Sequence, residues 1–243
     1  MKPCTFLILA LLSLDSTDSV DVDVTSPVTE LIEKFNPHTS RDCAILSVGG
    51  PELMRYSMVS DFLETGVLEL SYVEFGLNYA DFSIGIFQMK PSFVEQLEVS
   101  VCGNPQLLTQ YQKLITYPAE DDQMIRAERI RRIKSPEYQY LILGAFYDHC
   151  MMHYCSYLEG RNSEDIVRFV GTAYNMGFNK SVEEILQYQP RENFPYGAKY
   201  KGDQYAYSSV SAEIFKQLIK SLCKNSYSTF LQDYSYGLAR NYP

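Results

Sequence analysis

Apolar residues recur every three to four positions along most of this chain, which is the spacing of one face of an α-helix. The clearest runs lie at 28–35, 43–54, 58–75, 93–101, 107–115, 136–152 and 166–170. No stretch alternates polar and apolar residues for long enough to indicate a major strand, and there is no internal repeat. The pattern predicts a mainly α-helical single domain with a small or absent sheet.

Prolines and glycines mark the ends of these runs. Pro37 follows the first run, Gly49-Gly-Pro51 interrupts the second, and Pro136 opens the long run at 136–152. Proline ends a helix or begins one at its first turn, so each of these positions is an expected helix boundary. Ser40 or Asp42 is the expected N-terminal cap of the second helix.

Composition narrows the class of protein. The 243 residues are 46% hydrophobic and 21% charged, which is typical of one well-buried globular domain. The net charge of -9 argues against nucleic acid and anionic membrane surfaces as partners. The chain has 20 Tyr, 13 Phe and no Trp, so any aromatic surface for stacking against a sugar must be Tyr or Phe.

The N-terminus has the pattern of a targeting segment. Lys2 precedes an apolar run at 4–14 that is too short to span a bilayer and suits the core of a signal peptide. We expect residues 1–25 to be a signal peptide and short linker and 26–243 to be the folded domain of an exported protein, periplasmic or secreted, with no stable membrane span. The competing interpretation is a buried N-terminal helix, which the aspartates at 15–23 disfavour.

Cysteine usage gives no disulfide framework. Export would remove Cys4 and leave five cysteines, at positions 43, 102, 150, 155 and 223. An odd number at these spacings predicts small core side chains for most of them, and at least one free thiol or an intermolecular bond.

Two short motifs suggest chemistry. Gly85-Ile-Phe-Gln-Met-Lys-Pro91 is the pattern of a turn that feeds a helix, with a glycine free to take positive φ and a proline in the first helical turn. Ala173-Tyr-Asn-Met-Gly177 closes a helical run, with Gly177 as its C-terminal cap. In this order the pair resembles the soluble lytic transglycosylase family of the lysozyme superfamily, whose motifs read roughly Gly-Leu-Met-Gln-x-x-Pro and Ala-Tyr-Asn-Ala-Gly. The resemblance covers about residues 40–190 and leaves the C-terminal third unexplained.

The resemblance implies a lysozyme-like (transglycosylase-like) fold and a peptidoglycan-cleaving enzyme that needs no cofactor or metal. It implies that a single Glu, as acid and then base, cuts the β-1,4 bond between MurNAc and GlcNAc while the substrate's own C6 hydroxyl attacks to give a 1,6-anhydro product. Gln88, Tyr174 and Asn175 would line the saccharide subsites, and Ser83 would form a hydrogen bond with the N-acetyl group. The alternative for Asn175 is a helix cap, and for Tyr174 a core position.

The acid itself has three candidates. Such a group is a Glu that keeps its proton near neutral pH because apolar neighbours desolvate it. Glu52 is preferred because it follows the apolar run at 44–48 and a helix break that can turn it into a cleft. It lies farther from Gln88 than the family's acid does from its Gln, which requires an inserted helix. Glu69 has nearly the family's spacing but lies mid-helix, and Glu64 is intermediate.

A hydrolase would also need a partner carboxylate. Asp81 is the candidate, and the alternative is that it caps the turn of Ser83 and Gly85. His149, His153 and Cys155 have metal-ligand spacing, but no second ligand pair accompanies them, and a packed helix is the preferred interpretation.

The Tyr-rich stretch at 194–207 is expected to form one wall of the saccharide groove, with Lys199 or Lys201 facing the anionic glycan. A loop that only seals the core is the alternative. A different class of function also stays open: a non-catalytic glycan-binding or cell-wall scaffold protein with a lysozyme-like fold.

Overall fold

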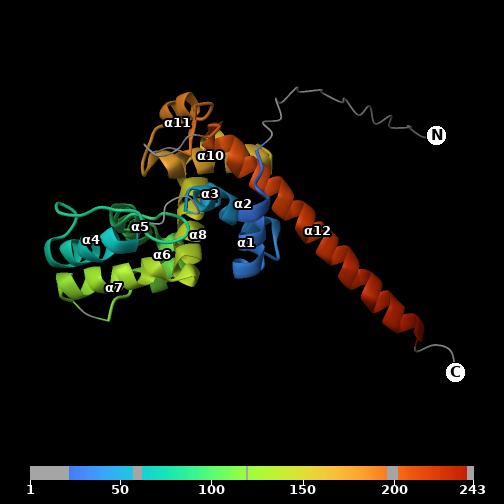
Figure 1. The fold of residues 1–243 in the computed structure, drawn as a ribbon, viewed down its shortest axis with the longest axis horizontal. Helices are drawn as coiled ribbons and strands as arrows, with labels where there is room; N and C mark the ends of the chain where they lie inside the picture. The colour runs from blue at the N-terminus through green and yellow to red at the C-terminus, as the bar shows by residue number, and fades with distance from the viewer. Residues whose placement is uncertain (1–21, 57–61, 119, 196–201, 240–243) are drawn as a thin grey trace, which may run out of the picture.

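The computed structural model describes residues 22–56, 62–118, 120–195 and 202–239, with side chains for all of these except 56, 62–65 and 225–239. The described residues form a mainly α-helical single domain with twelve helices and one small antiparallel sheet (Figure 1). The predicted fold class is confirmed at this level. The helices are α1 Thr25–Phe35, α2 Ser40–Gly49, α3 Pro51–Tyr56, α4 Phe62–Phe75, α5 Pro91–Gly103, α6 Pro105–Ile115, α7 Asp122–Lys134, α8 Pro136–His153, α9 Cys155–Leu158, α10 Ser163–Met176, α11 Val182–Tyr188 and α12 Tyr207–Ala239.

Helix α2 lies at the centre of the domain. Its residues from Cys43 to Gly49 are all buried, and it packs against α8, α10 and α12. The helix begins with a capping box: the Thr39 hydroxyl accepts the Asp42 backbone N–H, and the Asp42 carboxylate accepts the Thr39 N–H. The N-terminal cap is therefore Thr39, and the expectation of Ser40 or Asp42 in that position was wrong. The reciprocal bonds satisfy donors that would otherwise be left at the helix start.

Helices α4 to α7 form one side of the molecule (Figure 1). Arg126 of α7 donates from Nε to the Val73 carbonyl at 2.8 Å and from Nη2 to the Glu74 carbonyl at 3.1 Å. These are terminal carbonyls of α4, which have no partner within their own helix. The arginine thus caps α4 and fixes it against α7.

The C-terminal third covers the central helices. The first part of α12 packs on α2 and α10, and Val210, Ile214 and Leu218 contribute buried side chains. With 33 residues the helix is about 50 Å long, and its C-terminal half extends away from the body (Figure 1). The segment that the family resemblance leaves unexplained therefore supplies part of the core.

The sheet consists of β1 Glu192–Phe194 and β2 Tyr205–Ala206, paired antiparallel just before α12. The two strands bracket the Tyr-rich stretch predicted to line a groove. Residues 196–201, which carry both of its candidate lysines, lie outside the described residues, so that expectation stays a prediction.

The expectation that most of the cysteines are small core residues was wrong, whereas the expectation of a free thiol is confirmed. Among the described cysteines, Cys43 and Cys150 are buried free thiols, whereas Cys102, Cys155 and Cys223 are exposed free thiols. Residues 1–21 of the proposed signal peptide lie outside the described residues. Val22 and Val24 already lie in the core, so a cleavage that keeps this core intact must precede Val22.

None of the helices in the described part of the chain is both long and apolar enough to cross a membrane.

Candidate functional site

A cavity of about 290 Å³ opens between α3, the segment at 81–90, the start of α5 and the end of α10. It brings together the side chains singled out from the sequence: Glu52, Ser83, Gln88, Tyr174 and Asn175 all line it. These residues come from three separate parts of the chain. Their convergence on one cavity makes it the candidate site.

Glu52 lies in the first turn of α3 and is only 5% exposed. Burial raises the pKa of its carboxyl from 4.5 to about 7, although the charge of Arg55 and a hydrogen bond from Tyr207 lower it in part. Its Oε2 atom is buried without a hydrogen-bond partner among the described residues. A carboxyl in this environment keeps its proton near neutral pH and can donate it, as general acid catalysis requires.

Two glycines at the junction of α2 and α3 permit close contacts there. A Cβ at Gly49 would lie 3.0 Å from the Phe87 ring, and one at Gly50 would lie 2.9 Å from the Leu46 carbonyl oxygen. Pro51 then starts α3 directly after α2 ends. The predicted break at these residues is therefore present, and it places Glu52 beside the cavity.

The two alternate acids have different surroundings. Glu69 binds Lys134 at 2.8 Å across α4 and α7, and it is not among the residues that line this cavity. Glu64 belongs to the part of α4 whose side chains are not described. Of the three candidates, Glu52 is the one whose described environment suits a proton donor.

Gln139 of α8 packs against the turn that starts at Gly85 and stabilises it. Gly85 has φ 73°, and a Cβ there would lie 1.7 Å from Gln139 Nε2. The buried Gln139 amide accepts the Phe87 N–H at 3.0 Å and donates to the Ile133 carbonyl at 2.7 Å. Glycine is required here both by the backbone conformation and by the close approach of this side chain.

Gln88 follows within the same turn, with φ 50°. Its Nε2 donates to the Gly85 carbonyl at 2.8 Å, so the side chain folds back over its own turn. Part of its hydrogen-bonding capacity therefore stabilises the turn. The remaining amide hydrogen and the amide oxygen are the groups it offers to a ligand.

Tyr174 and Asn175 enter from the last turn of α10. The Tyr174 hydroxyl donates to the Phe87 carbonyl at 2.7 Å, and its ring packs edge-on against Phe93 and Phe146. Tyr174 therefore ties α10 to the Gly85 turn. Asn175 Nδ2 is buried and has no hydrogen-bond partner within the described chain. An unsatisfied buried donor is costly, which favours a ligand that supplies the acceptor.

Asp81 caps the N-terminus of α5. Its two carboxylate oxygens accept the Ser92 backbone N–H at 3.0 Å and the Ser92 hydroxyl at 2.8 Å, in the first turn of α5. Lys90 lies 3.9 Å away. The alternative interpretation, in which Asp81 caps the turn of Ser83 and Gly85, was therefore wrong, and its carboxylate accepts hydrogen bonds at the start of α5.

The two histidines of α8 stack on each other. The rings of His149 and His153 are 5.4 Å apart, and His149 also stacks on Phe178, which lines the cavity. Burial lowers the His149 pKa, with a further contribution from His153. Among the described residues, no group of three or more His, Cys, Asp or Glu side chains is arranged to hold a metal ion.

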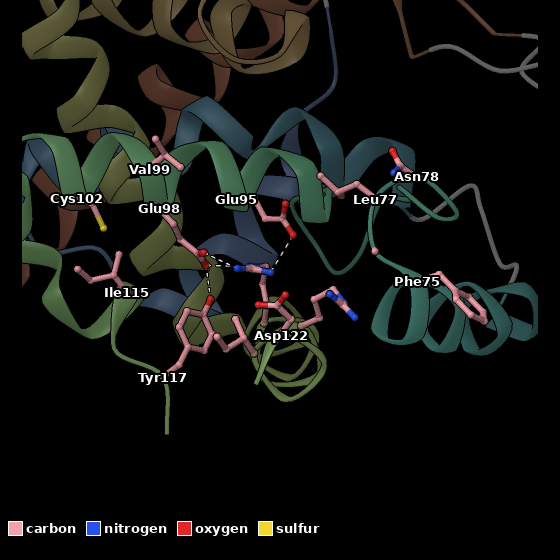
Figure 2. A pocket seen from close by; sticks show the side chains of 14 residues that line it. Phe75, Leu77, Asn78, Glu95, Glu98, Val99, Cys102, Ile115, Tyr117 and Asp122 are labelled. Carbon is pink, nitrogen blue, oxygen red and sulfur yellow. Dashed lines mark hydrogen bonds and ion pairs between the residues drawn. The ribbon is translucent and has the colours of Figure 1, made fainter. Parts of the chain in front are cut away.

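A larger cavity, of about 700 Å³, lies between α4, α5 and α7 (Figure 2). Arg129 is its central charge: it binds Glu95 at 2.9 Å, Glu98 at 2.7 Å and the Tyr72 hydroxyl at 2.6 Å. Tyr117 also donates to Glu98. These polar groups satisfy one another and join α4, α5 and α7. In the Glu52 cavity, by contrast, Glu52 Oε2 and Asn175 Nδ2 have no hydrogen-bond partner within the described part of the chain. The smaller cavity is therefore the better candidate for binding and catalysis.

Comparison of this chain with protein-family models, with curated proteins and with solved structures found no match in any of the three. The case for a function therefore rests on the cavity itself and on the two motifs.

Three residues of the site were not singled out from the sequence. Arg55 had a detectable signal, because it lies one turn after Glu52 on the same short helix. Gln139 is a buried polar residue inside an apolar run, which is a weak sign of a bracing role. Tyr207 reaches Glu52 from α12, and nothing local in the sequence indicates that contact.

Proposed function

We propose that this protein is a peptidoglycan-cleaving enzyme with a lysozyme-like fold, resembling a lytic transglycosylase, in which Glu52 is the catalytic acid. The observation that carries the proposal is the position of Glu52: a buried carboxyl, with a pKa of about 7, in the cavity that both motifs line. The Gly85 and Tyr174 motifs are far apart in sequence, and a direct hydrogen bond joins them, from Tyr174 to the Phe87 carbonyl.

The mechanism follows from the protonation state of Glu52. The protonated carboxyl donates its proton to the glycosidic oxygen as the bond between MurNAc C1 and that oxygen breaks. The resulting carboxylate then accepts the proton of the MurNAc C6 hydroxyl as its oxygen bonds to C1, which gives the 1,6-anhydro product and restores the acid. Developing positive charge at C1 is the common feature of glycoside cleavage.

The state of Asp81 favours this single-acid route over hydrolysis by two carboxylates. Both of its oxygens accept hydrogen bonds from Ser92. A second catalytic carboxylate would have to leave these bonds or keep them while activating a water. The charges of the cavity also fit an anionic glycan, because with Glu52 protonated the charged side chains that line it are Arg55, Lys90 and Asp81, which sum to one positive charge.

Incubating the purified protein with cell-wall sacculi, followed by mass spectrometry of the soluble products, tests the proposal. We expect 1,6-anhydro muropeptides from the unmodified protein and from Glu69→Gln and Glu64→Gln, and none from Glu52→Gln. Products with reducing ends would identify a hydrolase instead. Binding to sacculi without any product would identify the non-catalytic glycan-binding class.

A further inference from the structure

Arg55 lies next to the acid at ion-pair distance. Its Nη1 lies 3.8 Å from Glu52 Oε2, which is within ion-pair range but too far for a hydrogen bond. Both residues belong to α3 and both line the cavity. The Arg55 side chain is 25% exposed and the Glu52 side chain 6%, so the guanidinium is the member of the pair that solvent reaches more easily.

We propose that Arg55 recognises an anionic substituent on the saccharide and that their pairing drives proton uptake by Glu52. The acid is then protonated when an acidic glycan occupies the cavity. This rests on the proposed function of the site. The substrate class it selects is a glycan with a carboxylate beside the scissile bond, as opposed to a neutral amino-sugar polymer.

The physical basis is competition for one positive charge. Arg55 stabilises the ionised form of Glu52, while burial stabilises the neutral form. A carboxylate that pairs with the guanidinium neutralises its charge and adds a negative charge nearby. Both changes disfavour ionised Glu52, and exclusion of water by the ligand acts in the same direction.

The other groups that face Glu52 do not replace Arg55 in this role. Tyr207 from α12 hydrogen-bonds with Glu52, and burial raises the pKa of the Tyr174 phenol from α10 well above its ordinary value; neither phenol brings a positive charge to the acid. The second cation of the cavity, Lys90, lies 3.9 Å from Asp81 and is 53% exposed. Arg55 is the cation whose charge the structure couples directly to the acid.

The test uses the full chain and two disaccharides that differ in one carboxylate: GlcNAc–MurNAc, which carries the lactyl group, and GlcNAc–GlcNAc. Glu52 is titrated by NMR of ¹³C-labelled glutamate side chains, with its signal assigned from Glu52→Gln. Without ligand, Arg55→Gln is expected to raise the Glu52 pKa by about one pH unit, whereas Arg55→Lys retains the charge and changes it little. An unchanged pKa in Arg55→Gln would overturn the inference.

Because ligand binding and protonation of Glu52 are linked, the shift in the Glu52 pKa predicts how the affinity for the ligand depends on pH. A rise of about one unit in the Glu52 pKa makes the dissociation constant of GlcNAc–MurNAc about tenfold lower at pH 6 than at pH 9. Calorimetry in buffers of different ionisation enthalpy should show matching proton uptake. GlcNAc–GlcNAc should show a smaller dependence, Arg55→Gln should abolish the difference between the two sugars, and Lys90→Gln should preserve it.

Two results separate this inference from the function on which it rests. Binding of both disaccharides with the same pH dependence overturns the role of Arg55 and leaves the glycan-cleaving assignment in place. Failure of GlcNAc–MurNAc to bind the unmodified protein overturns the proposed function and the inference with it.

Discussion

Replacing Glu52 by Gln is expected to change how the stability of the folded protein depends on pH. The carboxyl has a pKa of about 7 in the folded protein against 4.5 in its ordinary state, because burial disfavours the charged form. Between these values the unfolded chain loses the proton while the folded protein keeps it. Stability therefore falls as pH rises through this window and is constant again above it.

The size of the effect follows from the shift. One pKa unit corresponds to about 1.4 kcal/mol, so Glu52 lowers the free energy of unfolding by roughly 3 kcal/mol between pH 4 and pH 8. Gln cannot ionise and has no such term. The free energy of unfolding of Glu52→Gln, measured relative to that of the unmodified protein, should therefore rise by roughly 3 kcal/mol from pH 4 to pH 8. Any pH-independent effect of the amide on stability cancels in this comparison.

Urea unfolding of both proteins at these two pH values measures the difference directly. Glu69→Gln is the matched control: it removes only the ion pair with Lys134 at the protein surface, so its effect should stay within about 1 kcal/mol. If the stability difference between Glu52→Gln and the unmodified protein is the same at pH 4 and pH 8, Glu52 is not a buried, proton-holding carboxyl and the reasoning fails.

Three further substitutions test the supports of the site by the same unfolding assay. Gly85→Ala should lower the free energy of unfolding by about 2 kcal/mol or more, because alanine is strained at this positive φ and its Cβ would overlap Gln139. An unchanged urea midpoint would contradict the close approach of Gln139. Tyr174→Phe should cost about 1–2 kcal/mol by removing the bond to the Phe87 carbonyl, and a neutral result would show that this bond is not made. Arg129→Met should cost about 3–5 kcal/mol because it leaves two glutamates without their cation, and a stabilised variant would refute that account.

Several helix boundaries follow from the sequence because prolines and glycines mark them, whereas α7, α9, α11 and α12 were not predicted. Pro91, Pro105 and Pro136 each stand at the first position of a helix, and Gly177 follows the end of α10 with φ 95°. Local sequence decides such boundaries, since they depend on backbone conformation more than on tertiary contacts. The cap of α2 was missed because Thr39, Ser40 and Asp42 are all suitable cap residues, and only the folded geometry distinguishes them.

The meeting of the site residues could be anticipated only through the two motifs. Nothing in local pattern places Tyr174 beside Phe87, because that contact depends on how α10 packs beside the turn that starts at Gly85. Gln139 and Tyr207 were missed for the same reason: each reaches the site from a distant helix. The charge environment of Glu52 was likewise hidden, since burial, which dominates its pKa, is a property of the assembled fold.

The most direct test of the central claim is the rate at which the protein releases muropeptides from sacculi as a function of pH. If protonated Glu52 is the acid, the rate with sacculi well below saturation should fall with rising pH along a limb whose midpoint lies near the free-enzyme Glu52 pKa of about 7, and Glu52→Gln should release almost nothing at any pH. Undiminished release at pH 9, or release by Glu52→Gln close to that of the unmodified protein, would contradict the account.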